Sequence, residues 1–333
     1  MKNNKMWALL INLGTWYGVW NGTNGELKFD EEVWEYIIEE APKAGIDTIV
    51  ICIGGGIDFA SHPEISLKGA WSRERLKSEI ARLSQKGIRV IPKLNFATTH
   101  SVWLSEYSRM ISSSVYYKVA KDLIEEAYEL FEHPEYIHLG MDEEDEKHVR
   151  KKEYAVYRQG SLYWHDLRYL IDCVAATGAK PWIWSCPLFD HPDEFEKHIG
   201  KDEIVLSPWY YNAFRKEHWT PVESRAEYVA YYNEGEYAQM GIKFVEEDPF
   251  LVNVRRLAIP LLANGYHYIP CASVYNRCDY NTSDLVEYFR DNSPDEQIDG
   301  YITAPWVNVV PEYRHFFEES FKFLKEAKEK FYS

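Results

Sequence analysis

The stretch Tyr136-Ile137-His138-Leu139-Gly140-Met141-Asp142-Glu143 decides the fold prediction for this chain of 333 residues. Its first five residues are typical of a buried strand and show no helical period. Two adjacent carboxylates, Asp142 and Glu143, follow that strand directly. In barrel enzymes the chemistry lies at the carboxyl ends of the parallel strands. We therefore predict that the acidic pair marks a functional site at the mouth of a barrel.

Strands and helices alternate on both sides of this stretch. Continuous apolar runs predict strands at residues 7–13, 48–53, 89–96, 136–140, 181–185, 203–207, 266–271 and 300–304. Helical periods and end signals predict helices at residues 31–44, 72–86, 116–130, 163–176, 249–263 and 312–331. This alternation predicts an α/β fold, a single-domain (β/α)8 or TIM barrel over residues 1–333 with loop insertions. A doubly wound open sheet is the alternative, although Gly54-Gly55-Gly56 lacks the spacing of a dinucleotide-binding loop.

The composition narrows the set of partners. A net charge of −16 disfavours nucleic acid and anionic membranes, and no stretch is long and apolar enough to span a bilayer. The 12 Trp and 25 Tyr residues are compatible with sugar binding, because flat aromatic faces stack on sugar rings, and also with a role in filling the core. Five cysteines without a Cys-x-x-Cys motif predict free thiols, and the N-terminal apolar run is short for a signal peptide, so we predict a cytoplasmic protein. No cofactor is expected, and a homo-oligomer stays open.

A second set of residues lies at the ends of the other predicted strands or just after them. These residues are His100, Trp184, Trp209, Tyr210, Tyr211, Tyr275, Asp279 and Trp306. In a barrel they share one mouth with the acidic pair. Carboxylates ringed by Trp and Tyr indicate glycoside hydrolysis, because the sugar needs an apolar face and the scissile oxygen needs a proton donor.

Three segments resemble family-20 glycoside hydrolases, the β-N-acetylhexosaminidases. Residues 138–143 resemble that family's His/Asn-x-Gly-x-Asp-Glu motif, and residues 91–101 are similar to its Ile-Pro-Glu-Ile-Asp-x-Pro-Gly-His-Ser. Residues 180–184 resemble the strand whose Trp begins the acetamide pocket. The resemblance extends over most of the predicted barrel, from the second strand to the eighth. It implies an exo-acting enzyme that removes a terminal N-acetylhexosamine from an oligosaccharide or glycoconjugate.

The resemblance also implies retaining, substrate-assisted hydrolysis. Glu143 would protonate the glycosidic oxygen and later activate water, while the substrate's 2-acetamido carbonyl acts as the nucleophile. Asp142 would orient the acetamide N–H and stabilise the developing positive charge. The family's tyrosine donor falls on Tyr275 by strand order, with Tyr210 as runner-up. The three tryptophans that would box the acetamide methyl are Trp184, Trp209 and Trp306.

The chain departs from the family at the positions that bind the sugar hydroxyls. The first strand carries Trp7 with no nearby Arg, and Thr98-Thr99 replaces Pro-Gly. Asn308 stands where the family has Glu, and Asp279 lies two residues later than the family's Asp. We therefore predict a terminal β-N-acetylglucosamine or β-N-acetylgalactosamine, with a lean towards N-acetylgalactosamine. The accessory domain that usually precedes the family's barrel is expected to be absent.

Structural interpretations compete with these functional ones. The acidic run 142–146 could be only a helix start favoured by the helix dipole. His100 and His138 could be core histidines, and the tryptophans could serve barrel packing. A metal site through His138 and Asp142 lacks a recognised ligand spacing.

Two other functions also stay open. The first is a conventional retaining glycosidase in which Glu143 is the acid and Glu247 or Asp279 the nucleophile. The second is a non-catalytic sugar-binding barrel, which the altered hydroxyl-reading positions favour. Sugars without an acetamide separate the first from the family-20 prediction, and the absence of any turnover would identify the second.

Overall fold

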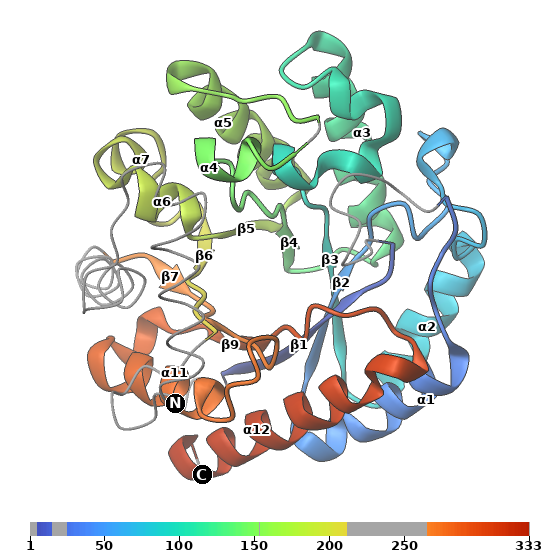
Figure 1. Cartoon of the computed structure of the whole chain (residues 1–333), viewed down its shortest axis with the longest axis vertical. Helices are drawn as coiled ribbons and strands as arrows, with labels where there is room; N and C mark the ends of the chain where they lie inside the picture. Colours follow the sequence, from blue (N-terminus) through green and yellow to red (C-terminus); the bar gives the residue numbers. More distant parts are fainter. Residues whose placement is uncertain (1–4, 15–24, 153, 212–264, 333) are drawn as a thin grey trace.

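The computed structural model describes residues 5–14, 25–152, 154–211 and 265–332, in which strands alternate with helices (Figure 1). In these ranges nine parallel strands form one sheet in the order β7-β6-β5-β4-β3-β2-β1-β9-β8. The strands are β1 Met6–Asn12, β2 Thr48–Cys52, β3 Arg89–Lys93, β4 Tyr136–His138, β5 Lys180–Trp184, β6 Val205–Ser207, β7 His267–Tyr268, β8 Cys271–Ala272 and β9 Gly300–Thr303. Each predicted strand is therefore present, and the seventh is divided into β7 and β8.

The divided strand closes the barrel. On one side, Cys271 N donates to Pro208 O (2.8 Å), just beyond β6. On the other side, Ile302 N in β9 donates to Pro270 O (3.0 Å). Pro270 has no N–H to donate, which accounts for the break between β7 and β8. The segment 267–272 thus joins both ends of the sheet, and the predicted α/β barrel is confirmed.

Helices surround the strands (Figure 1). The α-helices are α1 Glu31–Glu40, α2 Arg73–Gln85, α3 Ser114–Leu130, α4 Glu146–Val149, α5 Gly160–Thr177, α6 Cys186–Asp190, α7 Pro192–His198, α11 Asn281–Asn292 and α12 Arg314–Tyr332. The 3-10 helices are η1 Pro42–Ala44, η2 Pro63–Ile65, η3 Thr98–Arg109, η5 Asp295–Gln297 and η6 Pro311–Tyr313. The predicted helix 31–44 is α1 followed by η1, and the predicted helix 249–263 lies outside the described residues.

The best-predicted helix shows why the sequence pattern worked. Ser72 Oγ accepts from Arg75 N (3.1 Å), so Ser72, the first residue of the predicted helix 72–86, is the N-cap of α2. Leu76, Ile80 and Leu83 of α2 are buried at helical spacing. The sequence did not predict α11, whose start carries no side-chain cap.

Side chains alternate between the inside and the outside of the barrel. Along β1, Ala8 and Leu10 belong to the interior cluster, whereas Leu9 and Ile11 pack in the outer core under the helices. Beyond the carboxyl end of a strand, alternate residues that continue the inward set therefore lie closest to the barrel axis. Trp184, Trp209, Tyr211 and Trp306 follow this rule, because all four belong to the interior cluster or pack against it.

The described residues contain no helix with the length and apolarity needed to cross a membrane. All five cysteines lie in the described ranges, and all five are free thiols, as predicted. Four of them are buried, and Cys186 is partly buried beside Trp209.

Candidate active site

The predicted acidic pair lies after β4 at the carboxyl end of the barrel. Gly140, Met141 and Glu143 all have positive φ values, of 75°, 69° and 56°. The chain therefore turns sharply before both carboxylates. Asn95 Nδ2, from the end of β3, donates to Asp142 Oδ1 (3.0 Å) and holds that carboxylate in place.

Gly140 is required at this turn for two reasons. Its φ lies in the left-handed region, which costs other residues about 1–2 kcal/mol. A Cβ at Gly140 would also lie 1.9 Å from Asn95 Oδ1, far inside van der Waals contact. The glycine thus lets Asn95 approach the backbone and reach Asp142.

Gly140→Ala should therefore destabilise the protein more than the backbone conformation alone explains. Gly87 provides a matched control, because its φ is also 75° and nothing lies within 4 Å of a Cβ there. We expect Gly87→Ala to lose about 1 kcal/mol of unfolding free energy, and Gly140→Ala to lose roughly 1–3 kcal/mol more through overlap with Asn95. Urea denaturation measures both losses. Equal losses would show that the contact with Asn95 does not constrain residue 140.

His100 lies between the two carboxylates. Its Nε2 is 3.3 Å from Asp142 Oδ2 and 3.3 Å from Glu143 Oε2. Burial alone would lower the pKa of His100, but Asp142 and Glu143 outweigh burial and raise it to about 9. Burial alone would raise the pKa of Asp142, yet His100, Lys93 and Asn95 hold it well below its usual range. At neutral pH the site thus pairs an imidazolium with an ionised Asp142.

The imidazole of His100 should titrate with a midpoint near pH 9, above the ordinary value of 6.5. Because this pKa is raised on folding, its contribution to stability is full below pH 6.5 and is lost as pH rises towards 9. We therefore expect wild type to exceed His100→Gln in unfolding free energy by a constant amount between about pH 5 and pH 6.5, where Asp142 is ionised in the folded and the unfolded chain, and by progressively less above pH 6.5. Histidine-labelled NMR, assigned with His100→Gln, measures the midpoint. A midpoint near 6.5 would contradict the ion pairs.

A second histidine, His148, also approaches Glu143. Its Nε2 is 3.7 Å from Glu143 Oε1, and its Nδ1 is 2.5 Å from Asp145 Oδ2. Asp145 caps α4, accepting from His148 N at 3.0 Å. Glu143 therefore has an imidazole near each carboxylate oxygen. Sequence reasoning missed His148, although an acidic cap three residues before it in a short helix was a usable signal.

Two polar side chains lie deeper in the barrel, below the carboxylate pair. Lys93 is 1% exposed, with Nζ 3.6 Å from Cys52 Sγ and 5.8 Å from the centroid of the Trp184 ring. His138 is fully buried, and its Nδ1 accepts from Gly140 N (2.9 Å). Burial and the nearby Lys93 charge hold the pKa of His138 well below its usual range. His138 is thus a neutral core histidine, and Lys93 is a buried cation that sequence reasoning did not single out.

An aromatic wall adjoins the pair. It consists of Trp184, Trp209, Tyr211 and Trp306. The ring centroids of Trp184 and Trp306 are 5.6 Å apart, those of Trp209 and Tyr211 are 5.1 Å apart, and those of Tyr211 and Trp306 are 6.3 Å apart. Burial, Cys271 and then the charges of Asp142 and Glu143 raise the pKa of Tyr211. Its hydroxyl therefore lies within electrostatic range of the carboxylates.

The remaining predicted residues lie in other surroundings. Tyr210 is 2% exposed and packs in the outer core, away from the inward set that contains Tyr211. Tyr275 is 39% exposed and Asp279 is exposed, so both are more open to solvent than Glu143, at 25%. Asn308 is buried and forms a backbone bridge with Asn12 at the end of β1. Glu247 lies outside the described residues.

The described residues contain one group with the geometry for a metal ion. His100, Asp142 and Glu143 offer ligand atoms within 4.8 Å of one another. A metal ligand must be an unprotonated imidazole, whereas the pKa of about 9 keeps His100 protonated at neutral pH. His138, the histidine of the metal alternative, uses Nδ1 to accept from Gly140 N. A metal ion bound at this group would therefore have to displace the proton of His100.

Comparison with known proteins supports the fold. No protein-family model and no curated protein sequence matches this chain. The structure is similar to a β-N-acetylhexosaminidase from Bacteroides fragilis, with a TM-score of 0.61 and 13% identity, over 96% of this chain and 65% of that one. It is similar to a GH20 exo β-N-acetylglucosaminidase from Vibrio harveyi, with a TM-score of 0.56 and 13% identity, over 99% of this chain and 58% of that one. For Dispersin B the TM-score is 0.59 and the identity 12%, over 99% of this chain and 100% of that one.

This chain thus spans less than two thirds of the first two proteins and the whole of the third. At such low identity the likeness concerns the fold. The resemblance inferred from the sequence motifs is therefore confirmed as a shared barrel, and the chemistry has to be argued from the site itself.

Proposed function

We propose that this chain is an exo-acting β-N-acetylhexosaminidase that hydrolyses a terminal β-linked N-acetylhexosamine with retention. The observation that carries the proposal is the pair of adjacent carboxylates at the barrel mouth, one held ionised beside an imidazolium, next to an aromatic wall. The fold that this chain shares with proteins named as a β-N-acetylhexosaminidase and an exo β-N-acetylglucosaminidase supports it. We also propose that residues 1–333 form one catalytic barrel, and that the free thiols reflect a reducing, cytoplasmic location.

In this mechanism Asp142 acts on the acetamide. Its carboxylate would accept a hydrogen bond from the acetamide N–H and so orient the acetamide carbonyl oxygen towards the anomeric carbon. The carbonyl oxygen bonds to that carbon as the glycosidic bond breaks, and positive charge spreads over the resulting oxazolinium ring. An ionised Asp142 stabilises that charge because the site already holds its pKa low.

Glu143 transfers the protons. In the first step it would donate a proton to the departing glycosidic oxygen. In the second step water attacks the anomeric carbon, Glu143 takes the water proton, and the oxazolinium opens to the acetamide with retained configuration. His100 at 3.3 Å and His148 at 3.7 Å would orient Glu143 between these two roles, and His100 would also contact the bound sugar.

The sugar would stand against the aromatic wall. Trp184, Trp209 and Trp306 would enclose the acetamide methyl. Tyr275 is the proposed donor to the acetamide oxygen by strand order, and Tyr211 competes for this role because it continues the inward set. Activity lost in only one of the variants Tyr275→Phe and Tyr211→Phe would assign the donor.

The residues that bind the sugar hydroxyls determine which epimer is preferred. We propose that Asn308 and Asp279 contact the sugar hydroxyls, and that their difference from the family pattern favours N-acetylgalactosamine over N-acetylglucosamine. This preference is separate from the mechanism, because the chemistry depends on the acetamide group that both sugars share.

Four nitrophenyl substrates test the function. They are the β-N-acetylglucosaminide, the β-N-acetylgalactosaminide, the plain β-glucoside and the plain β-galactoside. Turnover of the acetamido sugars alone would support the proposal and name the epimer. Turnover of the plain sugars would instead identify a two-carboxylate glycosidase, and binding without turnover a sugar-binding barrel.

A further inference from the structure

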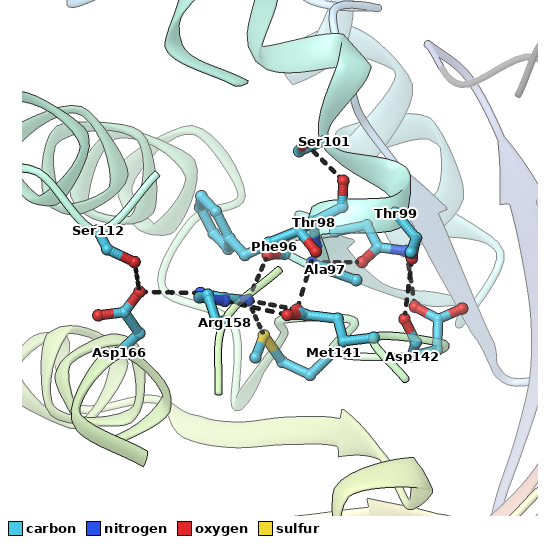
Figure 2. Close-up of polar contacts among 12 residues, drawn as sticks. Phe96, Ala97, Thr98, Thr99, Ser101, Ser112, Met141, Asp142, Arg158 and Asp166 are labelled. Carbon is cyan, nitrogen blue, oxygen red and sulfur yellow. Dashed lines mark hydrogen bonds and ion pairs between the residues drawn. The ribbon is translucent and has the colours of Figure 1, made fainter. Parts of the chain in front are cut away.

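Three charged side chains form a buried cluster beside the carboxylate pair. The side chains of Arg158 and Asp166 are fully buried, and that of Glu144 is 6% exposed. Arg158 Nε donates to Glu144 Oε2 (3.0 Å), and its Nη2 donates to the other oxygen of the same carboxylate. Arg158 Nη1 donates to Asp166 Oδ2 (3.3 Å). Figure 2 shows Arg158 between Asp166 and the loop that carries Met141 and Asp142.

The cluster connects the two loops that build the site. Glu144 directly follows the carboxylate pair, and its Oε1 accepts from Thr98 N (3.1 Å). Arg158 Nη2 donates to Phe96 O (3.2 Å), as Figure 2 shows. Phe96 and Thr98 belong to the segment that leads from β3 to His100. The guanidinium and the Glu144 carboxylate thus join this segment to the loop after β4.

The loop that they hold is conformationally strained. Met141 and Glu143 have φ values of 69° and 56°, in the left-handed region that residues with a side chain seldom adopt. Such conformations persist where the surrounding structure over-determines them. The Glu144 carboxylate provides this restraint, because it is bonded to Arg158 and to Thr98 N one residue after Glu143.

Stability alone is a weak reason for the cluster. Taking charges out of water costs about as much as their attraction returns, and apolar side chains of similar volume often replace such groups without loss. Asp166, the member of the cluster that lies farthest from the carboxylate pair, is instead fixed among the helices around the barrel. Asp166 Oδ2 accepts from Ser112 Oγ (2.6 Å), and Asp166 Oδ1 accepts from Tyr117 Oη (2.5 Å) on α3. The cluster therefore connects helices α3 and α5 to the strained loop after β4.

We infer that Arg158 is a positioning residue, which acts through Glu144 to keep Glu143 and His100 in contact across the two loops. The inference rests on the proposed function, since it identifies what holds the proposed acid–base residue in place. The planar guanidinium bonds both oxygens of Glu144 at once, and an ammonium group cannot reproduce this geometry. The shape of the side chain matters here as well as its charge.

Two variants separate positioning from packing. Arg158→Lys keeps the charge and loses the bidentate bond. The double variant Glu144→Leu/Arg158→Met removes both charges of the bidentate pair, and Asp166 keeps its hydrogen bonds from Ser112 and Tyr117. We expect the double variant to fold and to lose about 100-fold in kcat with KM within about twofold, and Arg158→Lys to lose about tenfold, because small misplacements of reacting groups are costly. Arg168→Met is the control, since Arg168 on the same helix as Asp166 pairs outward with Glu203 (2.8 Å) and should keep wild-type kcat.

A second readout needs no substrate. The NMR titration midpoint of His100, about 9 in the wild type, should fall towards 6.5 in both variants as the carboxylates move away. Wild-type kcat and an unshifted midpoint in the double variant would overturn the inference. If the double variant does not fold, the same two measurements on Arg158→Lys decide. An unreactive wild-type protein whose His100 midpoint still falls in the variants would overturn the proposed function and leave the positioning role standing.

Discussion

Glu143→Gln should lower kcat by about 10³-fold on an N-acetylhexosaminide with a poor leaving group, with KM little changed. Glutamine keeps the size of the side chain and its contacts with His100 and His148, but its amide is far too weak an acid to protonate the leaving group. A leaving group as acidic as nitrophenolate needs little protonation, so we expect a smaller loss on the nitrophenyl substrate. Steady-state kinetics on an unactivated oligosaccharide and on the nitrophenyl glycoside measure the difference.

The matched control for this substitution is Glu146→Gln. Glu146 belongs to the same acidic run, but its side chain is 59% exposed and pairs outward with Arg150. It should keep wild-type activity on both substrates. Equal losses of Glu143→Gln on good and poor leaving groups would contradict the acid role, because proton donation would then not be what the variant lacks.

The chain order of strand ends is what made the site predictable. Parallel strands bring their carboxyl ends to one mouth, so Asp142, Glu143 and His100 could be grouped from sequence alone. The side-chain period of two could have refined the grouping further. Along β6 the interior cluster contains Val205, and Tyr211 continues that parity whereas Tyr210 does not.

The burial of charged side chains could not be predicted from the sequence, for a physical reason. Lys93 and Arg158 belong to residue types that are almost always exposed, so a pattern search assigns them to the surface. Their burial depends on partners far along the chain, including Cys52 for Lys93 and the carbonyl of Phe96 for Arg158. Only the folded chain shows which charged residues have such partners.

The divided seventh strand has a similar explanation. The apolar run 266–271 predicts one strand. Pro270 within that run indicates a break, because proline cannot donate a hydrogen bond to a neighbouring strand. What preserves the strand is its position between β6 and β9, where the carbonyl of Pro270 still accepts from Ile302 N at 3.0 Å. Closure of the barrel therefore overrides the local break.

Asp142→Asn should lower kcat on acetamido substrates by about 10²–10³-fold, the range for removing one preorganised electrostatic partner of a developing charge. The neutral amide cannot offset the positive charge of an oxazolinium. It can still accept from Asn95 Nδ2, so we expect the fold to survive. The affinity for a stable bicyclic analogue of the oxazolinium should fall in proportion to kcat/KM, because such an analogue resembles the transition state. Kinetics and inhibitor titration on the wild type and the variant measure both quantities.

The comparison of the wild type with Asp142→Asn also distinguishes between the two catalytic mechanisms considered for the site. In substrate-assisted hydrolysis the nucleophile belongs to the sugar, so Asp142 matters only through the acetamide, and the product forms with retained configuration. In a two-carboxylate glycosidase the nucleophile is a protein carboxylate, and the bicyclic analogue would gain nothing from Asp142. Undiminished binding of the analogue to Asp142→Asn, or a product of inverted configuration, would therefore exclude the substrate-assisted mechanism while leaving the barrel and its acid–base residue unaffected.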